Sequence, residues 1–315
     1  MEVLNKDKTV VVIAGPTASG KTDLAINLAL KTKGEVISAD SMQIYRYMDI
    51  GTAKPSKEEM MGIPHHMIDI VDPDESYSVA FYKKDAENCI EDVISRDKLP
   101  IITGGTGLYI NSLIYNIKFS ETVIDEEFRK KMNQIAQTEG PEVLHQMLQR
   151  VDPESAEKIH YNNVKRVIRA LEVYEYTKKP MSQHKKESRM EPPQYRYLVF
   201  ILNMGRDRLY DRINKRVDIM LEAGLVDEVR RLLDMGYKPG STALQGLGYK
   251  EIISYLNNEV PFDEAIRVLK RDTRHYAKRQ LTWFKAIQNA IWLTGGSENI
   301  EKNTKEIQEY LETSI

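Results

Sequence analysis

The chain has 315 residues, of which 41% are hydrophobic and 29% charged, and its formal net charge is -2. This length accommodates one large domain or two, and no window approaches the ~20 consecutive apolar residues of a membrane helix. The N-terminus lacks the apolar segment and cleavage site of a secretory signal. Because Cys89 is the single cysteine, the sequence excludes an internal disulfide and a multi-cysteine zinc site, and we expect a reducing cytoplasm as its setting.

Short apolar runs alternate with helical patterns in the first third of the chain. Strands are predicted at residues 9–14, 34–39 and 99–105, and helices at 21–31 and 79–96. Such alternation indicates a parallel sheet with helices on both of its faces, and therefore an α/β fold.

Helical patterns replace the strands beyond the first third. A further strand is predicted at 195–204, and helices fill the remaining sequence. We therefore expect an α/β core made of residues 1–117 and 196–300, interrupted by an all-helical insertion at 118–195. Residues 301–315 are expected to form a peripheral tail. Because no self-complementary apolar helix stands out, we expect a monomer.

The stretch "GPTASGKT" joins the first predicted strand to the first predicted helix. It matches the phosphate-loop pattern G-x-x-x-x-G-K-[ST] in full, with Gly15, Gly20, Lys21 and Thr22 at the defining positions. In such loops backbone N–H groups surround phosphate oxygens, the lysine supplies charge, the hydroxyl reaches Mg²⁺, and the helix N-terminus adds its dipole. We therefore predict a phosphate site built from Gly15, Pro16, Thr17, Ala18, Ser19, Gly20, Lys21 and Thr22.

A nucleoside triphosphatase also needs an aspartate that holds the metal at the end of a second strand. The strand at 99–105 runs instead into Thr106, whereas Asp40 directly follows the strand at 34–39. Because the carboxyl ends of neighbouring parallel strands face one crevice, we expect Asp40 beside the phosphate loop, with Thr106 nearby. A carboxylate there suits proton removal from a nucleophile, as in a small-molecule kinase or a prenyl transferase. The alternative is that Asp40 only caps the next helix.

Seven segments in chain order carry a resemblance to a known family: "GPTASGKT", "ISADSMQIYRYMDIGTAKP", "PHHMIDI", "ITGGTGLYI", "RVIRALEVYE", "LQGLGYKE" and "AKRQLTWFK". They resemble the bacterial tRNA dimethylallyltransferases, also called tRNA isopentenyltransferases, as far as about residue 293. That family moves a dimethylallyl group from its diphosphate to the exocyclic amine of the adenine just 3′ of the anticodon. The resemblance implies a P-loop NTPase-like parallel sheet flanked by helices, an insertion that contacts tRNA, and dimethylallyl diphosphate as the owner of the bound phosphate.

The resemblance also assigns roles to individual residues. Asp40 matches the family's general base toward the adenine amine, and residues 15–22 match the loop that holds the pyrophosphate of the donor. Thr106 matches a threonine near the leaving group. Arg216 matches a basic residue toward the same pyrophosphate, although Arg212 lies one helical turn away. The catalytic candidates are thus Lys21, Asp40, Thr106 and Arg216, and the candidate ligand of the implied cofactor Mg²⁺ is Thr22.

Positive charge is concentrated near the C-terminus. Residues 267–285 contain seven Lys or Arg against one acid, Asp272, and at about 100° per residue six of these cations share one helical stripe. Such a face suits RNA phosphates, whereas the alternative, a solvated helix face, would normally mix signs. Together with the resemblance, this gives as predicted tRNA contacts Asp40, Ser41, Met42, Gln43, Thr106, Arg129, Lys165, Arg166, Arg169, Gln245, Gly246, Gly248, Arg274, Lys278, Arg279 and Gln280.

Three other functions fit the phosphate loop. One is prenylation of free AMP, ADP or ATP, as in the related adenylate isopentenyltransferases, against which the basic helix and the insertion argue. The second is a P-loop kinase of a small metabolite, which is disfavoured because no Arg-rich lid is evident. The third is an RNA-binding protein with a vestigial phosphate loop, which the intact set of catalytic candidates disfavours.

Overall fold

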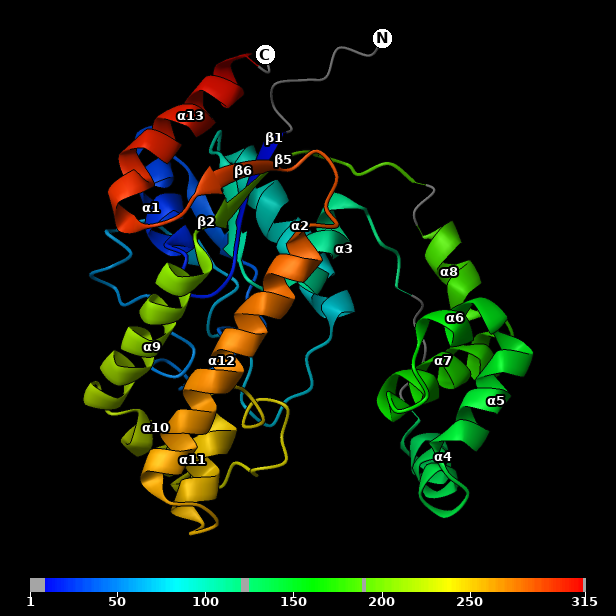
Figure 1. The fold of residues 1–315 in the computed structure, drawn as a ribbon. Coiled ribbons are helices and arrows are strands. Elements are labelled where there is room, and N and C mark those ends of the chain that lie inside the picture. The colour runs from blue at the N-terminus through cyan, green and yellow to red at the C-terminus, as the bar shows by residue number, and fades with distance from the viewer. Residues whose placement is uncertain (1–8, 120–124, 189–190, 314–315) are drawn as a thin grey trace. The chain divides into compact units, whose positions relative to one another are not determined.

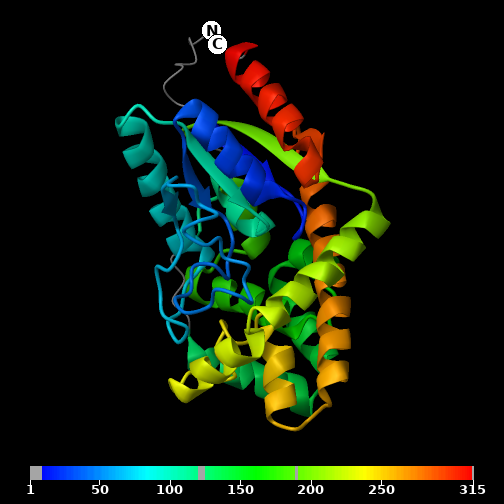
Figure 2. The same cartoon turned by 90° about the vertical axis from the view of Figure 1, so that its left-hand side faces the viewer.

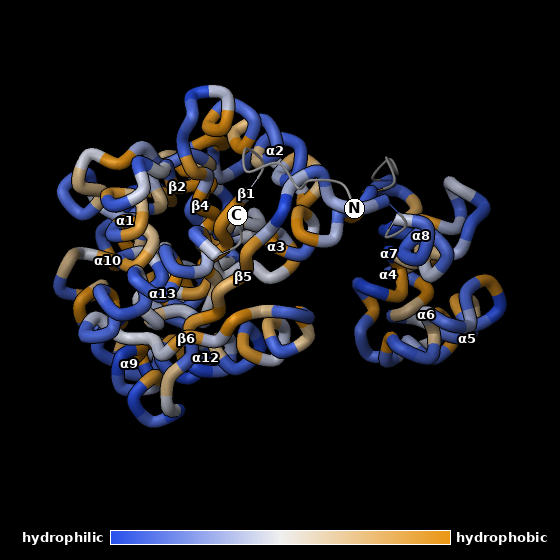
Figure 3. The backbone as a smooth tube through the Cα atoms, turned by 90° about the horizontal axis from the view of Figure 1, so that it is seen from above, coloured by the Kyte–Doolittle hydropathy of each residue, from blue (hydrophilic) through white to orange (hydrophobic). Residues whose placement is uncertain are grey.

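The structure is a computed structural model that describes residues 9–119, 125–188 and 191–313. The chain divides into two compact units, one formed by Met1–Ile114 with Gln194–Ile315 and the other by Tyr115–Pro193. Figures 1 and 3 show the elements of each unit. Within the described ranges, every helix is too short or too polar to cross a bilayer.

A parallel sheet forms the centre of the first unit. In the described part of the chain its strands are β1 (Thr9–Ala14), β2 (Glu35–Ser38), β3 (His65–His66), β4 (Pro100–Gly104), β5 (Arg196–Asn203) and β6 (Ile291–Thr294). Their order is β3-β2-β4-β1-β5-β6, and each neighbouring pair is parallel. The predicted α/β fold is therefore confirmed.

The two edge strands are not expected from the sequence. β6 lies where the sequence predicts helices, and β3 is only two residues long. Runs this short show no clear alternating pattern. They are strands because β6 pairs with β5 and β3 pairs with β2, which the local sequence does not reveal.

Helices cover both faces of the sheet (Figures 1 and 2). On one face lie α1 (Lys21–Thr32) and α13 (Ile300–Thr313), which pack together, and on the other lie α2 (Val79–Ser95) and α3 (Gly107–Ile114). Side chains of β1 that alternate along the strand, Val11 and Ile13, are fully buried in the layer that contains α1. The phosphate loop between β1 and α1 is thereby anchored at both of its ends.

The C-terminal segment is not the peripheral tail that we expected from the sequence. Ile307 of α13 is fully buried in one hydrophobic cluster with Leu24 and Leu28 of α1. The Thr304 hydroxyl also donates a hydrogen bond of 2.9 Å to the side-chain oxygen of Asn27. The described part of the segment, up to residue 313, is therefore a helix that packs on α1 through one buried face.

Four further helices of the first unit extend beyond the carboxyl ends of the strands (Figure 1). They are α9 (Arg206–Glu222), α10 (Leu225–Asp234), α11 (Tyr249–Leu256) and α12 (Phe262–Phe284). Ile44, Tyr45 and Met48, which follow β2 in the sequence, are buried among these helices in a second hydrophobic cluster. The segment that begins with Asp40 is therefore fixed on both sides, by the sheet and by this helical layer.

Glu228 of α10 ties the "MDIG" segment to the helical layer. Its carboxylate accepts hydrogen bonds of 2.8 to 3.0 Å from the backbone N–H groups of Asp49, Ile50 and Gly51. It also accepts a bond of 2.7 Å from the Tyr249 hydroxyl. Gly51 is required here because a Cβ atom would lie 2.6 Å from the Tyr249 ring. One buried carboxylate thus satisfies four donors and determines the path of this loop.

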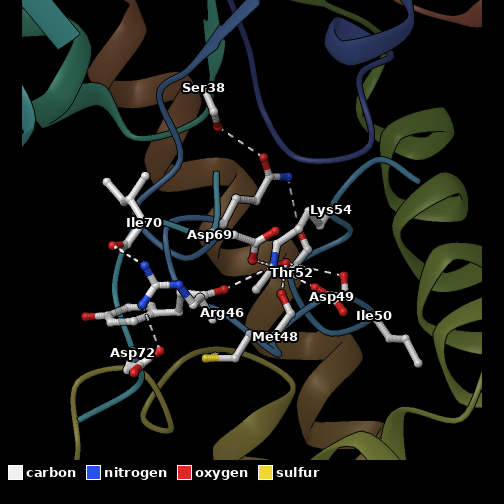
Figure 4. A network of polar contacts seen from close by, with 12 residues as sticks. Ser38, Arg46, Met48, Asp49, Ile50, Thr52, Lys54, Asp69, Ile70 and Asp72 are labelled. Carbon is white, nitrogen blue, oxygen red and sulfur yellow. Dashed lines mark hydrogen bonds and ion pairs between the residues drawn. The ribbon is translucent and has the colours of Figure 1, made fainter. Parts of the chain in front are cut away.

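A second polar network closes the same loop on itself (Figure 4). The Lys54 ammonium donates to the carbonyl of Tyr45 at 3.0 Å and pairs with Asp49 and Asp69 at 2.6 and 2.5 Å. The Lys54 side chain is only 5% exposed, and a buried ammonium needs such partners to offset its desolvation. The lysine of the "GTAKP" motif is therefore explained by loop structure.

The second unit is helical. Its described helices are α4 (Glu126–Thr138), α5 (Pro141–Val151), α6 (Pro153–Lys158), α7 (Val164–Thr177) and α8 (Met181–Glu187). Glu172 of α7 is fully buried and pairs with Arg129 at 2.8 Å and with Arg169 at 2.6 Å. Both arginines were predicted as tRNA contacts. The Arg129 pair joins α4 to α7, whereas the Arg169 pair lies within α7. Lys165 and Arg166 are exposed.

Replacing Glu228 by alanine should destabilise the first unit by about 3 kcal/mol, because four donors would lose a buried acceptor. Urea unfolding followed by tryptophan fluorescence measures this, since both tryptophans, Trp283 and Trp292, belong to the first unit. Glu222→Ala, at an exposed position of α9, is the control and should change stability by less than about 0.5 kcal/mol. Equal stability of the two variants would contradict the assigned role of Glu228.

Candidate active site

A cavity of about 360 Å³ lies at the carboxyl ends of the central strands. It is formed by the phosphate loop, the turn after β2, α9, the loop before α11, and α12. Among its lining residues are Thr17, Lys21, Thr22, Asp40, Ser41, Met42, Gln43, Arg216, Gln245, Gly246, Gly248, Tyr276, Arg279 and Gln280. The structure thus brings together these five parts of the chain, which are far apart in sequence.

Backbone and side-chain contacts to its carbonyl groups hold the phosphate loop in place. Gly20, at φ 90°, ends the loop in the left-handed region and caps α1, which begins at Lys21. The Arg212 guanidinium donates a 2.8 Å hydrogen bond to the carbonyl of Ala18, and the N–H of Gly296 donates one of 3.1 Å to the carbonyl of Ser19. These contacts occupy loop carbonyls, which leaves the N-terminus of α1 available to an anion.

Two cations share the cavity next to this loop. Burial, the charge of Arg216 and the opposing attraction of Asp40 together bring the pKa of Lys21 down to about 8. Burial likewise lowers the pKa of Arg216, with Asp23 opposing it. Two cations that each disfavour the other's charge are stabilised by an anion placed between them. Arg216 faces the cavity and Arg212 faces the loop backbone, a distinction that the sequence leaves open.

Asp40 lines the same cavity as these cations. One of its carboxylate oxygens accepts a 2.9 Å hydrogen bond from the N–H of Met42, which fixes the side chain in a local turn. The alternative that Asp40 caps a helix is wrong, because residues 41–44 form a turn and no helix follows directly. The charge of Asp40 acts on Lys21, and it also raises the pKa of Tyr276, after the larger effect of burial.

Thr106 positions the turn that carries Asp40. Its hydroxyl accepts a 3.0 Å hydrogen bond from the N–H of Ser41 and lies 3.2 Å from the Ser41 hydroxyl, to which it donates. The strand ends meet closely here, since a Cβ atom on Gly104 would lie 2.1 Å from the carbonyl oxygen of Ala39. Gly104 is therefore a steric requirement for bringing the ends of β4 and β2 together.

Several predicted tRNA contacts are engaged with the protein itself. The Gln43 side chain accepts from the Ser38 hydroxyl at 3.1 Å and donates to the carbonyl of Thr52 at 3.3 Å. Gln245 donates to the carbonyl of Pro239 at 2.9 Å, and Gly246 contacts Met42, because a Cβ atom there would lie 2.4 Å from the methionine methyl group. Gly248, at φ 94°, caps α11. These residues shape the cavity wall.

The basic stripe of α12 is partly neutralised. Arg267 pairs with Glu264, Lys270 with Asp218 of α9, and Arg271 with Asp272. Arg274 donates a 2.7 Å hydrogen bond to the side-chain oxygen of Asn214, also on α9. Lys278 and Arg279 lie exposed in the next turn, and Arg279 lines the cavity. The charge available to a partner is therefore concentrated in the second half of the helix, near the cavity.

The residues present fit a Mg²⁺ ion that binds together with a diphosphate. Within the described part of the chain, no group of three or more His, Cys, Asp or Glu is placed to hold a metal. Mg²⁺ usually keeps several waters and binds through one or two protein oxygens plus substrate phosphates. The hydroxyl-bearing Thr22 lines the cavity beside Lys21, and it supplies the single protein oxygen that such a site needs.

Comparison with known sequences identifies the family. The model described as IPP transferase matches residues 43–287 of this chain. A tRNA dimethylallyltransferase of Acetivibrio thermocellus is 59% identical over 96% of this chain and 97% of its own. One from Carboxydothermus hydrogenoformans is 52% identical over 94% and 95%. The chain belongs to the IPP transferase family.

Solved structures of IPP transferases share the fold. A tRNA isopentenylpyrophosphate transferase from Staphylococcus epidermidis has a TM-score of 0.73 and 45% identity, covering 98% of this chain and 100% of its own. The Bacillus halodurans enzyme has a TM-score of 0.72 and 43% identity, covering 98% and 97%. A eukaryotic dimethylallyltransferase acting on tRNA reaches 0.79 at 32% identity, covering 96% and 78%.

Sequence reasoning missed two parts of this IPP transferase site. Tyr276, which is not among the residues named from the sequence, lines the cavity, and its pKa is raised by burial and by Asp40. Its position one turn before Gln280 was the available signal. The Gly295–Gly296 turn, which supports the phosphate loop through the 3.1 Å bond to Ser19, lies outside the family match and carries no recognisable motif.

Pyrophosphate binding to this IPP transferase should weaken as the pH rises above about 8. Lys21 is charged below its pKa of about 8 and neutral above it, and a bound diphosphate favours the charged form. Between pH 7 and pH 9 the dissociation constant should therefore rise about tenfold, as measured by titration calorimetry.

Lys21→Arg is the matched control, because arginine stays charged throughout this range. The ligand's own ionisation is common to both proteins, so it cancels in the comparison. A pH dependence that is the same for both would contradict the assigned titration of Lys21.

Proposed function

We propose that this chain is a tRNA dimethylallyltransferase. It transfers a dimethylallyl group from dimethylallyl diphosphate to the exocyclic amine of the adenine 3′-adjacent to the anticodon and releases pyrophosphate. The observation that carries the proposal is one cavity in which a phosphate loop and two cations, Lys21 and Arg216, face a carboxylate, Asp40. Relatives of 52 to 59% identity that are named tRNA dimethylallyltransferases support it.

The reaction needs a proton acceptor for the amine and groups that stabilise the leaving pyrophosphate. The adenine amine is a weak nucleophile because its lone pair is delocalised, and the base must leave the stacked anticodon loop to enter a pocket. Asp40 accepts a proton from the amine while the nitrogen attacks the primary allylic carbon and the carbon–oxygen bond to pyrophosphate breaks. Lys21, Arg216 and the N–H groups of the phosphate loop stabilise the charge that grows on the leaving pyrophosphate.

A Mg²⁺ ion would act only on the diphosphate. When bound with the diphosphate, it neutralises charge on the phosphate oxygens. Thr22 is the residue that would hold it. Thr106 acts on the other side by fixing the turn at Ser41 through its 3.0 Å hydrogen bond, and so positions Asp40.

The tRNA is held by exposed positive charge. In the first unit we assign this role to Lys278 and Arg279 at the end of α12, and in the second unit to Lys165 and Arg166 of α7. Such contacts to phosphates give affinity that falls with salt concentration. Because tRNA is the acceptor, we expect the enzyme to act in the cytoplasm, and we propose that it acts as a monomer.

The acceptor assay tests the function directly. Labelled dimethylallyl diphosphate is supplied with tRNA, AMP or ATP, and we expect label in tRNA alone. Label in AMP or ATP would identify an adenylate isopentenyltransferase. Transfer of phosphate from ATP to a small molecule, without prenyl transfer, would identify a kinase. Neither alternative is supported by the names of the relatives.

Replacing Asp40 by asparagine should lower kcat by about 10²- to 10⁴-fold, the usual contribution of a general base. Affinity for tRNA should stay within about twofold, since the amide preserves the side-chain shape. Single-turnover kinetics and filter binding measure the two effects. Asp74→Asn, which alters an exposed carboxylate, is the control and should leave both values unchanged. A parallel loss of tRNA affinity would instead assign Asp40 to binding.

A further inference from the structure

We propose that Gln280 is a positioning residue for the phosphate loop, and that it makes no contact with RNA. It lies in the basic helix α12, directly after the exposed cations Lys278 and Arg279, and its sequence position therefore suggests an RNA contact. Its environment is different from theirs, because the Gln280 side chain is 6% exposed whereas the two cations are open to solvent.

Both ends of the Gln280 amide are used inside the protein. Its oxygen accepts a 2.9 Å hydrogen bond from the backbone N–H of Thr17 in the phosphate loop. Its nitrogen donates a 3.0 Å hydrogen bond to the carbonyl of Gly105, just after β4. One partner is a donor and the other an acceptor, so only a side chain that carries both functions satisfies them at once.

The amide packs tightly against the backbone of Gly105. A Cβ atom on Gly105 would lie 2.2 Å from the Gln280 nitrogen, and the nearest backbone beyond it is the carbonyl of Gly15 at 3.7 Å. The absence of a side chain at Gly105 therefore lets α12 reach the sheet at this point. The amide joins three segments: the loop after β1, the end of β4, and α12.

The same contacts extend to the proposed base. Gly105 precedes Thr106, whose hydroxyl accepts from the N–H of Ser41 at 3.0 Å, and Ser41 follows Asp40. Gln280 thereby links the loop that forms the anion cradle to the segment that carries the carboxylate. One turn of α12 thus serves two purposes, with RNA-facing cations on one side and a brace for the phosphate loop on the other.

The test separates anion affinity from RNA affinity. Gln280→Met is nearly isosteric and removes both hydrogen bonds. It should raise the dissociation constant for inorganic pyrophosphate and the KM for dimethylallyl diphosphate about tenfold, the effect of losing the one of these two bonds that supports the phosphate loop at Thr17. The dissociation constant for tRNA should stay within about twofold of the wild-type value. Calorimetry, steady-state kinetics and filter binding provide these readouts.

Two matched variants make the comparison specific. Gln288→Met is the same substitution at an exposed position and should leave every value unchanged. Lys278→Ala should weaken tRNA binding while pyrophosphate affinity is retained. Loss of tRNA affinity in Gln280→Met with unchanged pyrophosphate affinity would overturn the proposal, and so would equal pyrophosphate affinity in Gln280→Met and Gln288→Met.

A second substitution at the same position keeps the test valid if the first one destabilises the fold. If Gln280→Met unfolds below the assay temperature, Gln280→Glu is used, which keeps an acceptor for Thr17 but presents an oxygen to the carbonyl of Gly105. It should weaken pyrophosphate binding at least as much, with tRNA affinity retained, and unchanged pyrophosphate affinity would again overturn the proposal.

The inference rests on the proposed function. If the wild-type chain binds no pyrophosphate or transfers no label, the function fails, whereas equal behaviour of wild type and variant defeats only the role of Gln280.

Discussion

The close approach of the ends of β4 and β2 is the constraint on which the candidate active site depends. Gly104 has no side chain, so the end of β4 lies against the carbonyl of Ala39, where a Cβ atom would be only 2.1 Å away. That contact brings Asp40 into the cavity that Lys21 lines. On the proposed mechanism, a carboxylate and an ammonium in one cavity place proton removal and leaving-group stabilisation together.

The surrounding structure supports this arrangement with buried polar contacts. Glu228 satisfies four donors of the loop after β2, and Lys54 satisfies acceptors within it. Without these bonds, polar groups of the loop would be buried without a partner. Each such group would cost about 1–3 kcal/mol of stability. The "MDIGTAKP" motif is thus explained by the folding of the loop, and it serves the chemistry only by holding the segment that carries Asp40.

Sequence reasoning predicted the sheet and the neighbours of the phosphate loop because both follow from chain order and from the rule for parallel strand ends. It could not separate Arg212 from Arg216, since both share one face of α9 and the carbonyl of Ala18 decides between them. It also overstated the free charge of α12, because the partners of Lys270 and Arg274 come from α9. Contacts between distant segments are absent from local patterns.

The pairing of Thr17 with Gln280 joins residues that are 263 positions apart. A ribosome therefore synthesises most of the polypeptide before the cradle acquires this support. Contacts of such long range are slow to form because a large loop must close first. A nascent chain that ends before α12 would lack this brace. On the proposed role of Gln280, the anion site therefore takes its final form only after α12 has been synthesised and packed against the sheet.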